Sequence, residues 1–273
     1  MTNEIPDFDQ LTGLWRRSLI AWPDGREDRE TWVNWMQGQG IYIDLRQPVA
    51  KPDFHDVMGL RQLSQAQVEW IAEQEGFAGV LHFDGTYYEW RREIDFQPQA
   101  IYSDEGKLWF ENEMMIEEGR DIPYIEHWHA EPIGRHPLCA LRLEGREDGE
   151  RGFLLRVGSL FMYARGRKST LPEGQHLRDL VAQAPDLQSA QDLIDCEISQ
   201  GAITSAGWII QRSTLPYRDA QKLEPELVSR TGNGLTICDT ASNGRLMERC
   251  WDIIDVEGDL AAFSQTAKIQ MAR

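Results

Sequence analysis

Apolar and polar residues alternate with a period of two over much of this chain, and the clearest alternation spans residues 85–98. One side of that run consists of Tyr88, Trp90, Arg92, Ile94 and Phe96. Period-two alternation that is rich in aromatic residues and closed by a proline is typical of a β-strand with one buried face. Arg92 interrupts the apolar side. Because a guanidinium stays protonated, Arg92 needs an acidic or carbonyl partner if this side faces inward.

Short alternating segments flank this strand on both sides. Turns that contain proline, glycine, asparagine or aspartate separate them about every ten residues, which is typical of antiparallel strands in a closed barrel or a sandwich. One helix is predicted in the first half of the chain. It begins after Ser64, an N-cap residue that is followed three positions later by Gln67, and it ends at Gly76.

The second half of the chain repeats the order of the first. Three landmarks recur: residues 41–46 with 160–165 at an offset of 119, Tyr88 and Arg92 with Trp208 and Arg212 at an offset of 120, and Trp128 with Trp251 at an offset of 123. Landmarks that recur in one order at nearly one offset indicate an internal duplication. The chain is therefore predicted to be all-β, with two tandem antiparallel barrels of residues 1–134 and 135–273, each carrying a short helix.

A further helix is predicted in the C-terminal tail, residues 258–273. Leu260, Phe263 and Ala267 recur there at helical spacing, and Asp259 can cap the start. An isolated helix of this length is marginal in water, so its apolar side is expected to dock on its own chain.

Composition excludes several classes of function. The formal charge of −17 argues against nucleic-acid binding and against acidic membrane surfaces, because phosphate groups repel an acidic chain. No apolar run approaches the length of a membrane span, and the acidic N-terminal residues are unlike a secretory signal, so a cytoplasmic location is expected. The four cysteines form no Cys-x-x-Cys pair, which argues against a zinc site or a redox dithiol. No cofactor is expected.

Three stretches resemble a little-characterised family of fungal and bacterial proteins that includes a fungal casein-kinase-interacting protein. The matching text is GSLFMYARGR at residues 158–167, DCEIS at 195–199 and IQRSTLP at 210–216. The resemblance implies two lipocalin-like barrels in tandem and no established reaction. The chain is more loosely similar to the calycins at large, which include ligand carriers, bilin lyases and a few enzymes.

The candidate ligand-binding residues follow from the repeat. Arg92 and Arg212 recur in both halves and are candidates to anchor a carboxylate-bearing ligand inside each barrel, since the planar guanidinium matches a carboxylate with two hydrogen bonds. Tyr88, Trp90 and Trp208 would line the interior beside them. The alternative is structural: an arginine that closes a barrel end and stacks on an aromatic ring. A feature that two diverged domains share favours this architectural interpretation.

Two further clusters have mainly structural interpretations. His127 and His129 share one side of a strand, and such a pair can bind a metal, but no third ligand is visible at motif spacing. A solvent-facing pair beside an inward Trp128 is favoured, and no metal site is predicted. The basic residues of the segment 165–168 are interpreted as a solvated strand end, with an anion site as the alternative.

Three hypotheses for function remain open, because no complete catalytic constellation is visible. The first is a non-catalytic binding protein that holds a small, largely apolar ligand in one barrel. The second is an interaction protein with filled barrels that acts through a protein partner or as a homodimer. The third is a calycin-type lyase, isomerase or hydratase. A cavity distinguishes the first and third hypotheses from the second, and two buried titratable groups that converge in it distinguish the third from the first.

Overall fold

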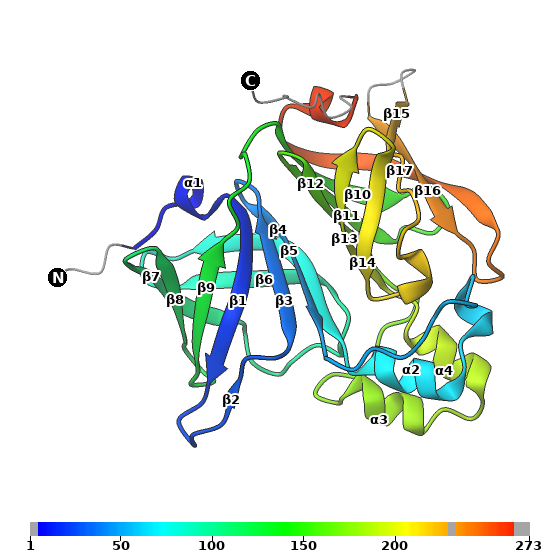
Figure 1. The fold of residues 1–273 in the computed structure, drawn as a ribbon, viewed down its shortest axis with the longest axis horizontal. Coiled ribbons are helices and arrows are strands. Elements are labelled where there is room, and N and C mark those ends of the chain that lie inside the picture. The colour runs from blue at the N-terminus through cyan, green and yellow to red at the C-terminus, as the bar shows by residue number, and fades with distance from the viewer. Residues whose placement is uncertain (1–4, 229–232, 265–273) are drawn as a thin grey trace.

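The computed structural model describes residues 5–228 and 233–264 and has two antiparallel sheets (Figure 1). The first is a closed barrel of eight strands, with the two-residue strand β2 added beside β1. Its strands are β1 (Gly13–Ala21), β2 (Glu27–Asp28), β3 (Trp32–Gln37), β4 (Ile41–Gln47), β5 (Glu75–Phe83), β6 (Tyr88–Asp95), β7 (Glu105–Glu111), β8 (Met114–Gly119) and β9 (Ile125–Ala130). The first and last strands, β1 and β9, pair over Trp15–Ala21 and close the barrel.

The second sheet is a curled half-barrel. Its strands are β10 (Leu138–Gly145), β11 (Arg151–Val157), β12 (Leu160–Arg165), β13 (Glu197–Thr204), β14 (Gly207–Ser213), β15 (Glu226–Val228), β16 (Gly234–Thr240) and β17 (Leu246–Gly258). Again the first and last strands pair, here β10 with β17, whereas β14 and β15 are the two ends of the described sheet. The prediction of an all-β chain with two tandem antiparallel barrel-like sheets is confirmed.

An irregular segment, residues 220–223, lies between the two ends of the half-barrel. Ile210 on β14 donates its N–H to the Gln221 carbonyl at 2.9 Å, and Leu223 donates to the Trp208 carbonyl at 3.0 Å. On the other side, Cys238 on β16 donates to the Leu223 carbonyl at 2.9 Å. The segment is thus hydrogen-bonded to strands on both sides of the opening.

The order of strands and helices is the same in both halves. Between the third and fourth strands of the closed barrel lie η1 (Leu60–Gln62) and α2 (Gln65–Ala72), and between those of the half-barrel lie α3 (Leu177–Ala182) and α4 (Leu187–Leu193). The third strands are matched at the predicted offset of 119, because Tyr42 pairs with Gly79 and Phe161 pairs with Gly201, and each glycine lies beside a β-bulge.

The same bulges correct the predicted match of Arg92 with Arg212. Arg92 lies opposite Gly79, but the residue opposite Gly201 is Ile210. The two arginines therefore occupy positions two residues apart in the repeat. The bulges themselves fall at equivalent places, so the difference arises in the hairpins: the β5–β6 turn spans residues 84–87, whereas the β13–β14 turn spans residues 205–206.

The bulge also divides the alternating face predicted for β6. Tyr88 and Trp90 point into the closed barrel and pack in its aromatic core. Beyond the bulge, Ile94 and Phe96 are buried on the opposite side, in a core shared by the two sheets and the helices. A one-residue shift moves every later side chain to the other face of a strand.

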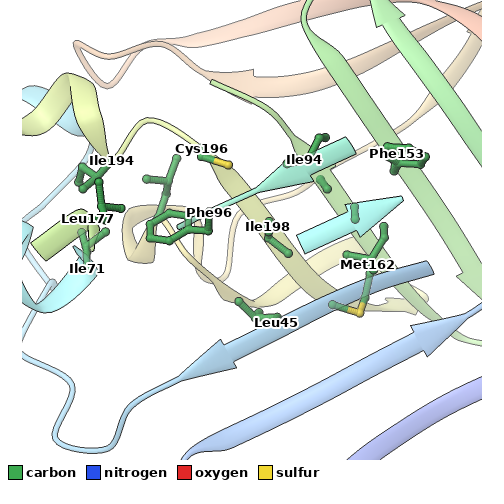
Figure 2. Packing of buried hydrophobic residues seen from close by; sticks show 14 of the residues in the cluster. Leu45, Ile71, Ile94, Phe96, Phe153, Met162, Leu177, Ile194, Cys196 and Ile198 are labelled. Atoms are coloured by element: carbon green, nitrogen blue, oxygen red, sulfur yellow. The ribbon is translucent and has the colours of Figure 1, made fainter. Parts of the chain in front are cut away.

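The shared core joins the two sheets by their outer faces (Figure 2). Leu45 of β4 lies near Met162 of β12 and Ile198 of β13, and the close-up places Ile71 of α2 beside Leu177 of α3. Strand β4 is buried on both faces, because its inward side fills the barrel and its outward side packs here. The barrels therefore form one body with a continuous apolar interior.

A half-buried carboxylate adds a polar contact between the sheets. Glu257 of β17 accepts backbone N–H groups from Gln39 at 2.9 Å, Gly40 at 3.0 Å and Ile41 at 2.8 Å. These three groups form the turn between β3 and β4. Because no residue on that turn carries a positive side chain, the backbone amides alone satisfy the carboxylate.

The helix predicted after Ser64 is confirmed, with Ser64 and Gln67 forming a reciprocal capping box. It ends at Ala72 and not at Gly76, because β5 already begins at Glu75. In the tail, η3 (Leu260–Ser264) is a 3₁₀ helix, and Phe263 stacks on Trp208 at 5.6 Å. Residues 265–273 of the predicted tail helix lie outside the described residues. Within the described ranges, none of the helices is long and apolar enough to cross a membrane.

Candidate functional site

The interior of the closed barrel is filled by aromatic side chains. Trp35 lies at the centre and packs edge-on against Trp90 and Trp128, each at 5.7 Å between ring centroids. Trp15 stacks on Trp35 at 6.4 Å, and Tyr88 stacks on Phe83 nearer the rim. The interior cavity beside Trp35 has room for about one water molecule.

Charged side chains occupy the helix-facing end of the same interior. The Arg46 guanidinium lies 2.8 Å from Asp44 and 3.9 Å from Glu126, and Arg17 lies 2.6 Å from Glu126. The Phe77 ring lies between two cations, with Arg46 at 5.0 Å and Arg92 at 3.6 Å from its centroid. Charges so deeply buried need such partners, and this network closes the barrel end.

Three carboxyl groups, those of Asp44, Asp104 and Glu117, border the one-water cavity. Burial raises the pKa of Asp44 to about 6 in spite of the adjacent Arg46. Burial also raises the pKa of Glu117 well above its usual range, and the nearby Glu126 adds to the increase. Tyr124 and Trp128 donate hydrogen bonds to Glu117 at 2.6 and 3.1 Å. These groups can exchange protons with a water molecule, but the cavity cannot hold an organic substrate beside them.

An Asp44→Asn variant is expected to lose part of the pH dependence of stability. The folded protein keeps the Asp44 proton up to about pH 6, whereas an unfolded chain releases it near pH 4, so the wild type loses stability as pH rises between these values. A shift of about two pKa units corresponds to roughly 3 kcal/mol. Urea denaturation from pH 4 to pH 7 measures this. The free energy of unfolding of the variant should rise relative to the wild type over that interval, and parallel curves would contradict the assignment.

Arg92 lies at the mouth of the closed barrel. It pairs with Asp95 at 2.8 Å and with Asp104 at 2.6 Å, and its side chain is 27% exposed. Asp95 ends β6 and Asp104 precedes β7, so Arg92 holds both ends of the connecting loop, residues 96–104. The structure supplies the acidic partners that the sequence required and also places an aromatic ring under the guanidinium.

Three open grooves meet at Arg92 and Asp95, with volumes of about 320, 620 and 900 Å³. The largest is called the apolar groove here. Its apolar lining consists of Ala72, Phe77, Pro98, Ala100, Ile101, Tyr102 and Ile122, and the rest of its lining consists of Glu73, Glu75, Arg92, Asp95, Gln97, Gln99, Gly174, Gln175, His176, Arg178 and Asp179. Its volume lies in the range of small-molecule sites, roughly 300–1,000 Å³.

The half-barrel does not place its candidate residues around a comparable opening. Trp208 is buried between Phe161 at 5.0 Å and Phe263 at 5.6 Å, as part of a packed core. Arg212 points outward, toward the closed barrel, where it lies 4.4 Å from the Trp32 ring and donates to Gln47 at 3.2 Å. The expectation that Arg212 faces the interior of its own sheet is therefore wrong.

A buried charge cluster fills the half-barrel instead. Arg218 pairs with Glu197 at 3.1 Å, and both side chains are at most 1% exposed. Arg249 bridges Asp239 at 2.8 Å and Glu150 at 2.9 Å. This cluster lies at the end of the sheet that corresponds to the Arg46 network of the closed barrel.

The inward arginine that repeats is Arg46 with Arg165, a pair that was not among the predicted site residues. Arg46 is the penultimate residue of β4 and Arg165 is the last residue of β12, at the confirmed offset of 119. Arg165 pairs with Asp195 at 2.7 Å and is 5% exposed. The signal was present, because both arginines close the two segments that match best, but the side on which a strand-end residue faces cannot be read from alternation alone.

The two histidines of β9 lie on the outer face of the closed barrel. His129 makes a hydrogen bond with Ser18 at 2.9 Å, and His127 lies on the same outer face. Burial lowers the pKa of His127, and the neighbouring Arg29 contributes. No group of three or more His, Cys, Asp or Glu side chains in the described part of the chain could hold a metal ion.

Comparison with known proteins identifies the fold. No family model matches the chain, and no curated protein matches its sequence. The crystal structure of the uncharacterized protein YLR301w from Saccharomyces cerevisiae superposes with a TM-score of 0.50 and 13% identity, over 90% of this chain and 98% of that chain. The two proteins share a fold. At this identity the likeness extends to the fold alone.

Proposed function

We propose that this chain is a non-catalytic binding protein that holds a small, largely apolar molecule in the apolar groove. The observation that carries the proposal is the contrast between this groove, of about 900 Å³, and an interior cavity with room for about one water molecule. Ile101, Tyr102 and Ile122 line the groove and are 78%, 62% and 50% exposed. An exposed apolar patch beside a groove is typical of a binding site.

The candidate residues take different roles in this proposal. Arg92 lines the groove and pairs with Asp104 at the end of loop 96–104, whereas Tyr88 and Trp90 belong to the aromatic core of the barrel and do not line the groove. Trp208 and Arg212 are not among the residues that line the groove. Both predicted domains contribute to the site, because the loop comes from residues 1–134 and the wall formed by α3 comes from residues 135–273.

Replacing Ile122 by aspartate is expected to weaken binding of a neutral fluorescent probe, N-phenyl-1-naphthylamine, by at least about tenfold. A charge in an apolar contact removes roughly 1.5–3 kcal/mol of hydrophobic stabilisation, and about 1.4 kcal/mol is tenfold in affinity. Fluorescence titration measures the dissociation constant. Ile254→Asp is the matched control, because Ile254 is 52% exposed and lies on β17, away from the groove. Equal binding by both variants would place the probe elsewhere, and no saturable binding by the wild type would reject the proposal.

The runner-up is an interaction protein with filled barrels, and the packed interiors favour it over an enzyme. In that case a second copy or another protein covers Ile101, Tyr102 and Ile122, and the Ile122→Asp variant changes the mass in solution instead of probe binding. A lyase, isomerase or hydratase needs room for a substrate beside Asp44 and Glu117, which the one-water cavity does not provide. Membership of the casein-kinase-interacting family, the domain boundary and a cytoplasmic location stay predictions.

A further inference from the structure

A second groove at Arg92 lies between the two barrels and has a volume of about 620 Å³. One wall is the end of β6 with the first residues of loop 96–104. The other wall comes from the half-barrel, and consists of the β10–β11 turn (Asp148–Arg151) and the segment after β12 (Gly166–Leu171). It is called the inter-barrel groove here. It shares Arg92, Asp95, Gln97, Pro98 and Gln99 with the apolar groove, so the two grooves are continuous at that edge.

Most carboxylates of the inter-barrel groove already have cationic partners. Glu93 pairs with Arg142 at 2.7 Å. Asp148 lies 3.7 Å from Arg249 as well as 3.4 Å from Lys168, so it keeps a cation when Lys168 binds another anion, and Asp95 lies 2.8 Å from Arg92. Glu150 pairs with Arg249, a residue of the buried cluster, at 2.9 Å. These acidic groups are therefore neutralised locally, and they do not give the groove a strong negative potential.

Two guanidinium groups of the groove have no carboxylate partner among the described residues. Arg167 donates through Nη2 to the Phe96 carbonyl at 2.5 Å, and Arg151 donates through Nη1 to the Glu93 carbonyl at 3.5 Å. A carbonyl accepts a hydrogen bond but does not neutralise the charge. Two guanidiniums with only carbonyl partners on one groove leave positive charge there that an anion can neutralise.

Buried polar atoms on the same groove also lack partners. The Nε atoms of Arg92 and Arg167 are buried donors without an acceptor, and Glu150 Oε1 is a buried oxygen without a donor. A buried polar group without a partner costs about 1–3 kcal/mol, so native proteins seldom leave several together. A molecule with several acceptor oxygens and one hydroxyl would satisfy all three.

We propose that the inter-barrel groove binds the anionic head of the ligand, a phosphate or carboxylate group, through Arg167, Arg151 and Lys168. The inference rests on the proposed function, since the apolar part of the same molecule lies in the apolar groove across the shared edge at Arg92. The segment 165–168 is then a site and not only a solvated strand end. Arg167 and Lys168 bind the head group, whereas Arg165 belongs to the buried cluster.

The test compares three molecules with the same eight-carbon chain: octyl phosphate, octanoate and octanol. Each is used to displace N-phenyl-1-naphthylamine from the wild-type protein. One charge-assisted contact corresponds to about tenfold in affinity, so at least one anion should displace the probe at about a tenfold lower concentration than octanol. The stronger of the two anions identifies the head group as phosphate or carboxylate. Equal potency of all three overturns the anion site but leaves the proposed function intact, whereas a wild type that does not bind the probe rejects the proposed function.

Two variants locate the effect. Arg167→Gln and Lys168→Gln should each weaken the anions by about tenfold and leave octanol unchanged. Lys168 is 70% exposed, so its variant keeps the fold even if Arg167→Gln disturbs the loop contact with Phe96. Arg29→Gln is the control for net charge, because Arg29 is exposed and far in sequence from the groove. An equal loss of anion potency in Arg29→Gln would show a general charge effect and overturn the site.

A measurement without the probe tests the anion site independently. The Nε–H signal of Arg167 in a nitrogen-15 NMR spectrum is identified by its loss in Arg167→Gln. Inorganic phosphate should shift this signal with saturation, and sodium chloride at the same ionic strength should not. A signal that responds equally to both salts overturns the inference, whether or not the apolar groove binds the probe.

Discussion

Replacing Arg218 by leucine should destabilise the protein by about 3–5 kcal/mol, because it leaves the carboxylate of Glu197 buried without its partner. Arg218 is 1% exposed and Glu197 is fully buried. The same guanidinium donates to Thr240 at 2.9 Å and to the Cys238 carbonyl at 3.1 Å, so the substitution also removes two contacts to β16. Urea denaturation at pH 7 measures the change in the free energy of unfolding.

A double variant separates the buried charge from the lost packing. Adding Glu197→Gln to Arg218→Leu removes the unpaired carboxylate and should recover part of the lost stability, since an apolar or neutral replacement of both partners is often well tolerated. Arg29→Gln, which removes an exposed ion pair with Glu27, should change stability by at most about 1 kcal/mol. A single Arg218→Leu variant as stable as the control would show that the buried pair contributes nothing to the fold.

Separating the chain into residues 1–134 and 135–273 is expected to have the second large effect on stability. Neither half is expected to unfold cooperatively alone, because each would expose the outer face that now packs in the shared core, including Leu45, Phe96 and Met162 (Figure 2). Fully burying one such side chain contributes roughly 1.5–3 kcal/mol, and whole domains are stable by only about 5–15 kcal/mol.

Calorimetry of each half and of their equimolar mixture tests this expectation. The mixture should regain a single cooperative transition if the halves reassemble through the shared core. Phe110→Ala is a comparison variant within the intact chain, since Phe110 packs against the barrel's own aromatic core and not against the other half. Two halves that each unfold cooperatively, at temperatures close to that of the intact chain, would show that the barrels are independent.

The fold was predictable because period-two alternation and the internal repeat can both be read from the order of residues alone. The offset between residues 41–46 and 160–165 predicted the equivalence of β4 and β12, and the ladders reproduce it. The match of Arg92 with Arg212 failed because the β5–β6 hairpin is longer than the β13–β14 hairpin, and a constant offset does not account for such a difference. The break in the β6 face, after which Phe96 packs outside the barrel, comes from the bulge, whose place does not follow from period-two alternation.

The candidate site could be predicted only in part. The position of Arg92 on an apolar face predicts that it needs acidic partners. This prediction is correct because it follows from the charge of the guanidinium alone. The grooves around it were not predictable, since they form where loop 96–104, the β10–β11 turn and the segment before α3 meet in space. No pairwise pattern in the sequence links these three stretches.

The segment 220–223 has a consequence for how copies of this protein meet. An open sheet ends in strands with unpaired backbone groups, and such an edge is a template for strand addition by another chain. On β14 those groups are already hydrogen-bonded, by Gln221 to Ile210 and by Leu223 to Trp208. The β14 edge thus gains protection against edge-to-edge aggregation from four irregular residues, without the complete ring of ladders that protects the closed barrel.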